Sequence, residues 1–247
     1  MLNKPLNFFS LLLISFQSLS QDLLPENEKE DIQISHKEYT ISYSVEYKQA
    51  KWDYSIITKN RKYGKYKRDN LSFVKDPKLT DDQSAKNSSY VGTNFDKGHL
   101  TAAEDMTFDK EVMKESFFLS NASPQMASFN RGLWKKLESK VRKWGREDFD
   151  TVYIISGGIL HNKLRRLNND ITIPDNFYKI VVTRNGNGEY KAIAFLMPNK
   201  PSKEPLSSFV VTIDKIEKLT KIDFFFKLRD DIENKLESET DLNFWRL

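Results

Sequence analysis

The chain has 247 residues but no cysteine and only three histidines. Without cysteine it forms no disulfide, carries no cysteine-linked lipid and offers no thiolate for a zinc site, so its stability has to come from a packed core. No repeat, low-complexity block or flexible linker divides it. Because 38% of the residues are hydrophobic and 13% are aromatic, the composition predicts one globular domain.

The apolar stretch that suggests targeting lies at the N-terminus. Lys4 precedes an apolar run over 6–16, and two serines shortly before Gln21 supply the small residues that a signal peptidase reads. The run is short for a membrane span, so we favour a cleaved signal peptide over 1–20 rather than an uncleaved anchor.

This cleavage point sets the expected organisation of the chain. Residues 21–38 are predicted to form an N-terminal extension, and residues 39–247 a single domain. A protein exported in this way is expected to be secreted or periplasmic, with no stable membrane association.

A strong excess of charge of one sign is also missing. The formal net charge is +4, and removal of Lys4 with the signal peptide leaves +3, which does not by itself indicate nucleic-acid binding. Basic residues do cluster over 59–68 with two tyrosines between them, and such a stretch neutralises phosphates and stacks on bases. The alternative is a solvated hairpin with Gly64 at its turn. Within this stretch we expect only Arg68 to face a substrate.

The three histidines differ in their sequence neighbours. Histidine is the most frequent base of hydrolases near neutral pH, because its ordinary pKa is about 6.5. His36 lies among polar residues and is expected at the surface, and His161 follows an apolar run and two glycines, where a buried strand turns out to solvent. His99 follows Asp-Lys-Gly at 96–98, and Gly98 lets the backbone approach a ligand closely. Taken alone, this tetrapeptide also fits a surface turn.

The motifs after His99 make the pattern specific. An Asn-x-x-Pro-Gln segment begins at Asn121, and Asn130 opens a predicted helix that carries Glu138. This order resembles the DNA/RNA non-specific endonuclease family, whose secreted bacterial and mitochondrial members share a ββα-metal active site. The likeness covers about 39–236. It implies a metal-dependent hydrolase of phosphodiester bonds.

The resemblance implies a role for each residue of the motif. His99 would be the general base, Asn130 the protein ligand of Mg²⁺ (with Mn²⁺ as an alternative), and Asn121 a residue that holds the catalytic arrangement. A neutral amide oxygen suits Mg²⁺, which keeps several of its waters. Glu138 would contact a metal-bound water; its alternative is an ordinary i,i+4 pair with Arg142. The alternative for Asn121 is a turn residue.

One position departs from the family pattern. Lys97 stands where the family usually has arginine, so it keeps the positive charge but loses the planar fork that binds phosphate through two hydrogen bonds. Lys97 and Arg68 are nevertheless the residues expected to stabilise phosphate charge.

The predicted fold class is α+β, with a mixed, largely antiparallel sheet, flanking helices and a ββα-metal active-site motif. The turn sequence over 184–188 predicts an antiparallel hairpin. In the helix over 132–144, Leu133 and Leu137 begin an apolar stripe for the core. The strands are predicted over 40–47, 54–58, 152–156, 178–183 and 190–197, the helices over 104–106, 110–117, 132–144, 213–219 and 230–237, and a loop over 82–89.

These observations lead to a secreted, Mg²⁺-dependent endonuclease that hydrolyses DNA and RNA and leaves 5′-phosphate ends. Two alternatives remain open at this point: a catalytically weakened relative that only binds nucleic acid, for which Lys97 would be the reason, and a phosphodiesterase that acts on small nucleotide substrates.

Overall fold

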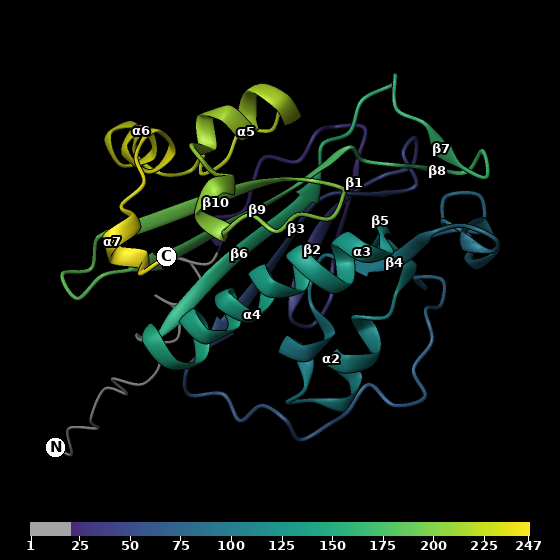
Figure 1. Ribbon diagram of the computed structural model, residues 1–247, viewed down its shortest axis with the longest axis horizontal. Helices are drawn as coiled ribbons and strands as arrows, with labels where there is room; N and C mark the ends of the chain where they lie inside the picture. The colour runs from purple at the N-terminus through teal and green to yellow at the C-terminus, as the bar shows by residue number, and fades with distance from the viewer. Residues whose placement is uncertain (1–20) are drawn as a thin grey trace, which may run out of the picture.

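The computed structural model describes residues 21–247, so the predicted signal peptide over 1–20 lies outside the described residues. A seven-stranded sheet runs through the described part of the chain in the order β1-β2-β3-β6-β9-β10-β11, and all neighbouring strands are antiparallel (Figure 1). Its strands are β1 (Ile32–Ser35), β2 (Tyr39–Ser44), β3 (Gln49–Thr58), β6 (Thr151–Gly158), β9 (Asn176–Arg184), β10 (Tyr190–Pro198) and β11 (Val210–Val211).

Both faces of the central strands are covered by apolar side chains. Successive residues of β6 point to opposite sides of the sheet, so Val152 and Ile154 pack in one core while Tyr153 and Ile155 pack in the other. Burial on both faces explains why the sequence of β6 is an almost continuous apolar run rather than an alternating one.

One core lies under the long helical segment that follows β5 (Ala122–Met126). This segment consists of α3 (Ala127–Phe129), a π-helical turn η4 (Asn130–Trp134), α4 (Lys135–Lys143) and a second π-helical turn η5 (Trp144–Asp148). Leu137, Val141 and Trp144 are fully buried and pack with the sheet, as the predicted apolar stripe requires.

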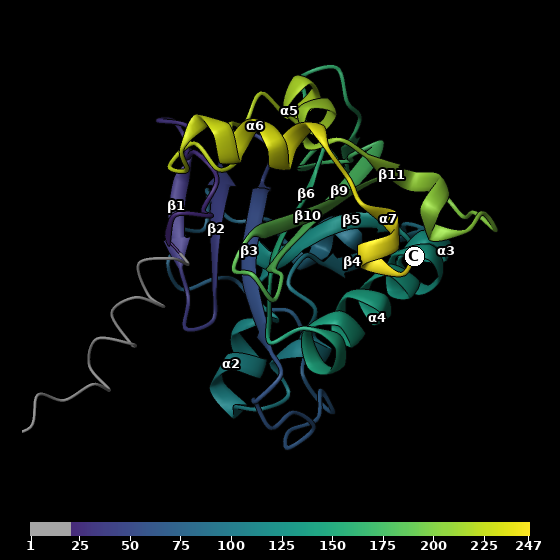
Figure 2. The same cartoon turned by 90° about the vertical axis from the view of Figure 1, so that its left-hand side faces the viewer.

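The other core lies under α5 (Ile213–Thr220) and α6 (Asp230–Ser238), which cover the opposite face of the sheet (Figure 2). Ile216 and Leu236 are their buried contacts. The C-terminal α7 (Leu242–Trp245) then returns to the first core, where the buried Trp245 ring meets that of Trp144 at 4.8 Å.

Short elements connect these layers. They are α2 (Lys110–Glu115), the 3₁₀ turns η1 (Asn87–Tyr90), η2 (Ala103–Met106), η3 (Leu119–Asn121) and η6 (Leu206–Phe209), and the strands β4 (Phe95–His99), β7 (Arg166–Leu167) and β8 (Ile171–Thr172). β4 pairs only with β5, and β7 only with β8. None of the helices within residues 21–247 combines the length and the apolarity needed to cross a membrane.

The α+β class and the antiparallel hairpin at 184–188 are confirmed, and each predicted strand and helix overlaps an observed one. The elements β1, β7, β8, β11 and α7 were not predicted, and three further differences lie closer to the site. The helix predicted over 132–144 extends from Ala127 to Asp148, the loop over 82–89 ends in η1, and the pair β4–β5 was not predicted as strands. The sequences of β4 and β5 do not alternate between apolar and polar residues, because the two strands pair with each other rather than with the large sheet.

Residues 21–38, predicted as an extension, are part of the fold. β1 forms an edge of the large sheet, Leu23 is fully buried, and the Trp52 indole donates a hydrogen bond to the Glu26 carbonyl at 2.9 Å.

Candidate active site

The site is built on the antiparallel pair β4–β5 and the helical segment that follows it, an arrangement of two strands and a helix (Figure 1). In this pair Gly98 lies opposite Ser123, and His99, at the end of β4, lies opposite Ala122. A Cβ atom on Gly98 would come within 2.2 Å of the Gln125 side chain, which is fully buried. Gly98 is therefore required by a close contact within the protein.

Asn130 stands at the first position of the π-helical turn η4. Its Nδ2 donates to the Asp96 carboxylate at 2.9 Å, and Arg131 donates to both oxygens of the same carboxylate at 2.7 and 2.8 Å. π-Helical turns inside α-helices occur frequently at functional sites. Asp96 thus fixes the Asn130 amide through its Nδ2 side only, and no hydrogen bond from residues 21–247 engages Oδ1.

A cleft of about 520 Å³ lies beside this turn. Three of the predicted site residues line it: Arg68, Asn130 and Glu138. The other lining residues are Ala102, Ala103, Glu104, Arg131, Lys135 and Arg142. Four of the nine lining side chains are cationic and two, Glu104 and Glu138, are acidic, so the net positive charge of the lining favours an anion such as a phosphate.

His99 lies next to this cleft in an aromatic setting. Its ring meets Phe73 at 4.7 Å and the edge of Phe117 at 4.9 Å, and the Arg68 guanidinium lies 5.5 Å from the centre of the same Phe117 ring. Nε2 of His99 is buried and has no hydrogen-bond partner within the described chain. Burial and, after it, the charge of Arg68 lower the pKa of His99 from 6.5 to about 3. The imidazole is therefore neutral at pH 7.

Glu138 is tied to His99 through Trp134. The Trp134 indole donates to the His99 carbonyl at 3.3 Å and is also hydrogen-bonded to the Glu138 carboxylate. Burial raises the pKa of Glu138 to about 7, although the nearby Lys179 opposes this rise. Arg142 bonds to Asp105 at 2.6 Å and not to Glu138, so the i,i+4 pair offered as the alternative does not form.

A divalent cation fits the donors that line the cleft. Asn130 offers an amide oxygen and Glu138 a carboxylate oxygen, both hard ligands of the kind that Mg²⁺ prefers. The free Oδ1 of Asn130 supports this reading, because Asp96 already occupies the Nδ2 side of the amide.

Asn121 is placed differently from an active-site ligand. It is fully buried, its Oδ1 accepts from the Thr101 amide at 2.8 Å, and its Nδ2 donates to the Thr101 and Ser116 carbonyls at 3.0 and 2.8 Å. It contacts neither the His99 ring nor the cleft. It fixes the backbone that directly follows His99.

Lys97 contacts an aromatic ring outside the lining of the cleft. Its ammonium lies 5.4 Å from the centre of the Tyr90 ring, and burial lowers its pKa. Lys97 does not appear among the residues that line the cleft. Any contact with substrate would therefore involve a part of the nucleic acid beyond the cleft.

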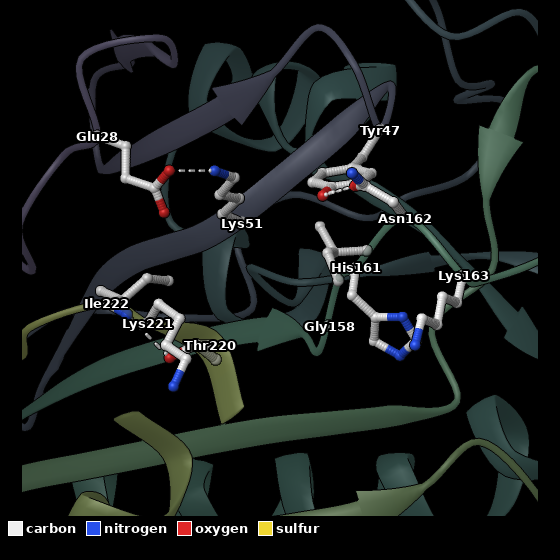
Figure 3. Close-up of a pocket in the computed structure, with 11 residues that line it drawn as sticks. Glu28, Tyr47, Lys51, Gly158, His161, Asn162, Lys163, Thr220, Lys221 and Ile222 are labelled. Atoms are coloured by element: carbon white, nitrogen blue, oxygen red, sulfur yellow. Dashed lines mark hydrogen bonds and ion pairs between the residues drawn. The ribbon is translucent and has the colours of Figure 1, made fainter. Parts of the chain in front are cut away.

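The expectation for His36 was wrong, because its side chain is 2% exposed. Nε2 of His36 lies 2.9 Å from the buried carboxylate of Asp76, a residue 40 positions away that no local pattern could reveal. His161 is exposed, as expected. It lines a separate and larger cleft, where Glu28 and Lys51 lie across from His161 and Lys163 (Figure 3). No predicted site residue lines that cleft.

Sequence reasoning missed a buried polar group beneath the site. Lys179 is 3% exposed, donates to the Ser156 hydroxyl and lies 4.5 Å from the centre of the Trp134 ring. Asp53 is fully buried and accepts from the Thr101 hydroxyl at 2.6 and 2.7 Å. The sequence signal that could have indicated this buried group is a single charged residue within or beside an apolar strand, because an unpaired buried charge is costly.

Comparison with known proteins adds to this geometry. A family model described as DNA/RNA non-specific endonuclease matches residues 19–231. The chain is 31% identical to Nuclease C1 of Cunninghamella echinulata var. echinulata over 210 residues, 79% of this chain and 83% of that protein. It is 28% identical to mitochondrial endonuclease G of Homo sapiens over 203 residues, 77% of this chain and 68% of that protein. Its fold is similar to a chain in the solved EndoG/EndoGI complex, with a TM-score of 0.78 and 23% identity over 90% of this chain and 98% of that chain.

Proposed function

Because the chain belongs to the DNA/RNA non-specific endonuclease family, we propose that it is a secreted, Mg²⁺-dependent nuclease that cleaves both DNA and RNA and leaves 5′-phosphate ends. Membership in this family makes it a nuclease. The substrate range, the metal, the product and the export are the proposal. One observation carries the chemistry: a neutral histidine lies beside a cationic cleft that also contains hard oxygen donors.

His99 acts as the general base in this proposal. A neutral imidazole accepts the proton of the attacking water, and a ring packed between Phe73 and Phe117 keeps one orientation. A phosphate bound at Arg68 would bring negative charge near the ring and raise the pKa of His99 toward its ordinary value. The base would then become stronger when substrate is in place.

Asn130 and Glu138 are the residues that would hold the cation, Asn130 through its amide oxygen and Glu138 through a metal-bound water. When bound, the cation stabilises negative charge on the leaving 3′ oxygen. Lys179 supports Glu138 from below, since its charge favours the ionised carboxylate. Arg68 neutralises phosphate charge at the rim of the cleft, with Lys97 in contact with a more distant part of the substrate.

Export rests on the N-terminal sequence. Lys4, the apolar run over 6–16 and the serines before Gln21 support a cleaved signal peptide, and N-terminal sequencing of the protein recovered from the medium tests it.

The function is tested by digestion of supercoiled plasmid and of a structured RNA, with Mg²⁺ and with EDTA. We expect the wild type to cut both substrates only with the metal, and 5′-end labelling after phosphatase treatment to reveal 5′-phosphates. His161→Ala, which changes an exposed histidine away from the cleft, is the matched control for His99→Ala.

Three outcomes would contradict the proposal. Cutting of one nucleic acid alone would exclude the broad substrate range, and undiminished cutting in EDTA would exclude the metal. Preference for dinucleotides or nucleotides over polymer would indicate a small-molecule phosphodiesterase.

A further inference from the structure

Five carboxylates gather where α5 and α6 meet. These two helices cover the face of the sheet opposite α4 (Figure 2). We call them the acidic corner: Asp214, Glu217, Asp223, Glu233 and Glu237. They form two groups of three that share Glu237, and within each group the carboxylate oxygens lie within 4.8 Å of one another. Two helices and the loop between them therefore bring their acidic side chains close together around Glu237.

Glu237 is the shared member and the most unusual one. It is 8% exposed, and its Oε1 is buried without a hydrogen-bond partner in the described chain. A carboxylate oxygen of Glu237 lies within 4.8 Å of ligand oxygens in both groups. A buried, unpartnered carboxylate oxygen costs considerable free energy unless a cation or a donor satisfies it.

The protein supplies no such cation within residues 21–247. None of the ion pairs in this range involves any member of the acidic corner. One member has a backbone partner, since the Phe224 amide donates to Glu217 at 2.8 Å. The remaining negative charge of the corner is left uncompensated.

We propose that the acidic corner is a Ca²⁺ site. Ca²⁺ takes six to eight oxygen ligands at about 2.3–2.6 Å, so oxygens that bind one ion lie within roughly 5 Å of one another. The carboxylate oxygens of each group meet this condition, because they lie within 4.8 Å of one another. Mg²⁺ fits less well, because it keeps several waters and takes one or two carboxylates in a stricter octahedral geometry. The site is separate from the cation site at Asn130.

Glu217 and Glu237 belong to the same group of three ligands. Since Glu217 lies on α5 and Glu237 on α6, the ion would join the two helices above the buried Ile216 and Leu236.

The test is thermal unfolding and isothermal titration calorimetry of the full chain with Ca²⁺. We expect one ion per chain at the corner and a rise in Tm of roughly 5 °C at saturation, because a ligand that binds only the folded state stabilises it. NaCl at the same ionic strength controls for charge screening. The variant Asn130→Ala separates this binding from any Ca²⁺ bound in the His99 cleft and should keep the rise.

Two variants remove members of the corner, and one is a matched control. Glu237→Gln deletes the shared ligand, and Asp223→Asn deletes an exposed one, so the second variant should fold as the wild type does. Both should abolish or halve the rise in Tm and weaken Ca²⁺ binding at least tenfold, with Mg²⁺-dependent nuclease activity unchanged. Glu239→Gln changes an exposed acid at the end of the same helix and should behave as the wild type.

The proposal would be overturned by any of three results. These are the absence of a Ca²⁺-specific rise in the wild type, a rise that persists in Glu237→Gln and Asp223→Asn, or a rise that disappears in Asn130→Ala.

Discussion

His36 and His99 are both packed against two aromatic rings, yet their polar surroundings differ. His36 meets Tyr39 and Phe118 at 4.6 and 5.2 Å and bonds to the Asp76 carboxylate. His99 has equally close rings, but no acidic side chain of the described residues bonds to it, and the cation beside it is Arg68. Aromatic packing orients both rings, whereas the charge of the neighbour decides what each imidazole does.

The same contrast explains the two pKa shifts. Burial opposes ionisation of Asp76, but hydrogen bonds from His36 and Ser120 outweigh it and lower the pKa of Asp76. For His99, burial and Arg68 both act against the protonated form. One histidine therefore completes a buried polar network of the scaffold, and the other is kept neutral beside the cleft.

Replacing His99 should give the largest effect. His99→Ala is expected to lower kcat on plasmid DNA by roughly 10³-fold or more, since a positioned base contributes about 10²- to 10⁴-fold. The measurement is initial rates with Mg²⁺, with circular dichroism as the check on folding. Activity within tenfold of the wild type in a folded variant would show that His99 is not the base.

Removing the amide of the cleft comes next. Asn130→Ala should lower activity about 100-fold and raise the Mg²⁺ concentration needed for half-maximal rate, because the ion loses its protein ligand. Arg131→Ala loosens Asp96 without deleting the amide oxygen and should cost less. An unchanged Mg²⁺ dependence in Asn130→Ala would place the metal elsewhere.

Replacing Arg68 tests whether its charge distinguishes His99 from His36, because Arg68 acts on the base as well as on the phosphate. Arg68→Gln should lower kcat/KM roughly 10- to 100-fold and, by removing a nearby positive charge, raise the pKa of His99. NMR titration of the His99 ring measures the second effect. A pKa of His99 that stays constant would show that burial alone sets it.

Replacing His36 should reduce stability rather than activity. His36→Ala is expected to keep most of the nuclease activity but to reduce the free energy of unfolding by about 2–4 kcal/mol, because Asp76 loses a partner inside the protein. Urea unfolding gives the value, and His161→Ala is the exposed control. A large loss of activity at full stability would assign His36 to the chemistry.

The smallest effect is a dependence of stability on pH. The unfolded chain protonates His99 near pH 6.5 and the folded one only near pH 3, so the unfolded state binds more protons in this window. The free energy of unfolding should therefore decrease as the pH is lowered from about 6.5 to about 3. This residue contributes at most about 1.4 kcal/mol per pH unit. His99→Asn should show a shallower fall, and an identical slope in the two proteins would contradict the low pKa.

The sequence predicted the parts of the site that a motif carries. His99, Asn130, Glu138 and Arg68 were predicted as site residues, and the last three line one cleft. The fold class followed from apolar periodicity and from the turn at 184–188, because both reflect local rules of burial and turn geometry.

What the sequence could not predict depends on contacts between distant segments. The Asp76 partner of His36, the clamp that Asn121 forms on Thr101 and the position of Lys97 against Tyr90 are all set by tertiary packing. Gly98 is the same case, since the Gln125 side chain that excludes a Cβ there comes from the neighbouring strand.

The most direct test of His99 as the general base is chemical rescue of a variant that lacks its ring. His99→Ala leaves a gap between Phe73 and Phe117 in which free imidazole can take the place of the ring. We expect added imidazole to restore cleavage by His99→Ala in a saturable, Mg²⁺-dependent manner and to leave His36→Ala unaffected. Rescue of His36→Ala, or imidazole-independent cleavage by His99→Ala at the wild-type rate, would contradict the assignment of His99 as the base.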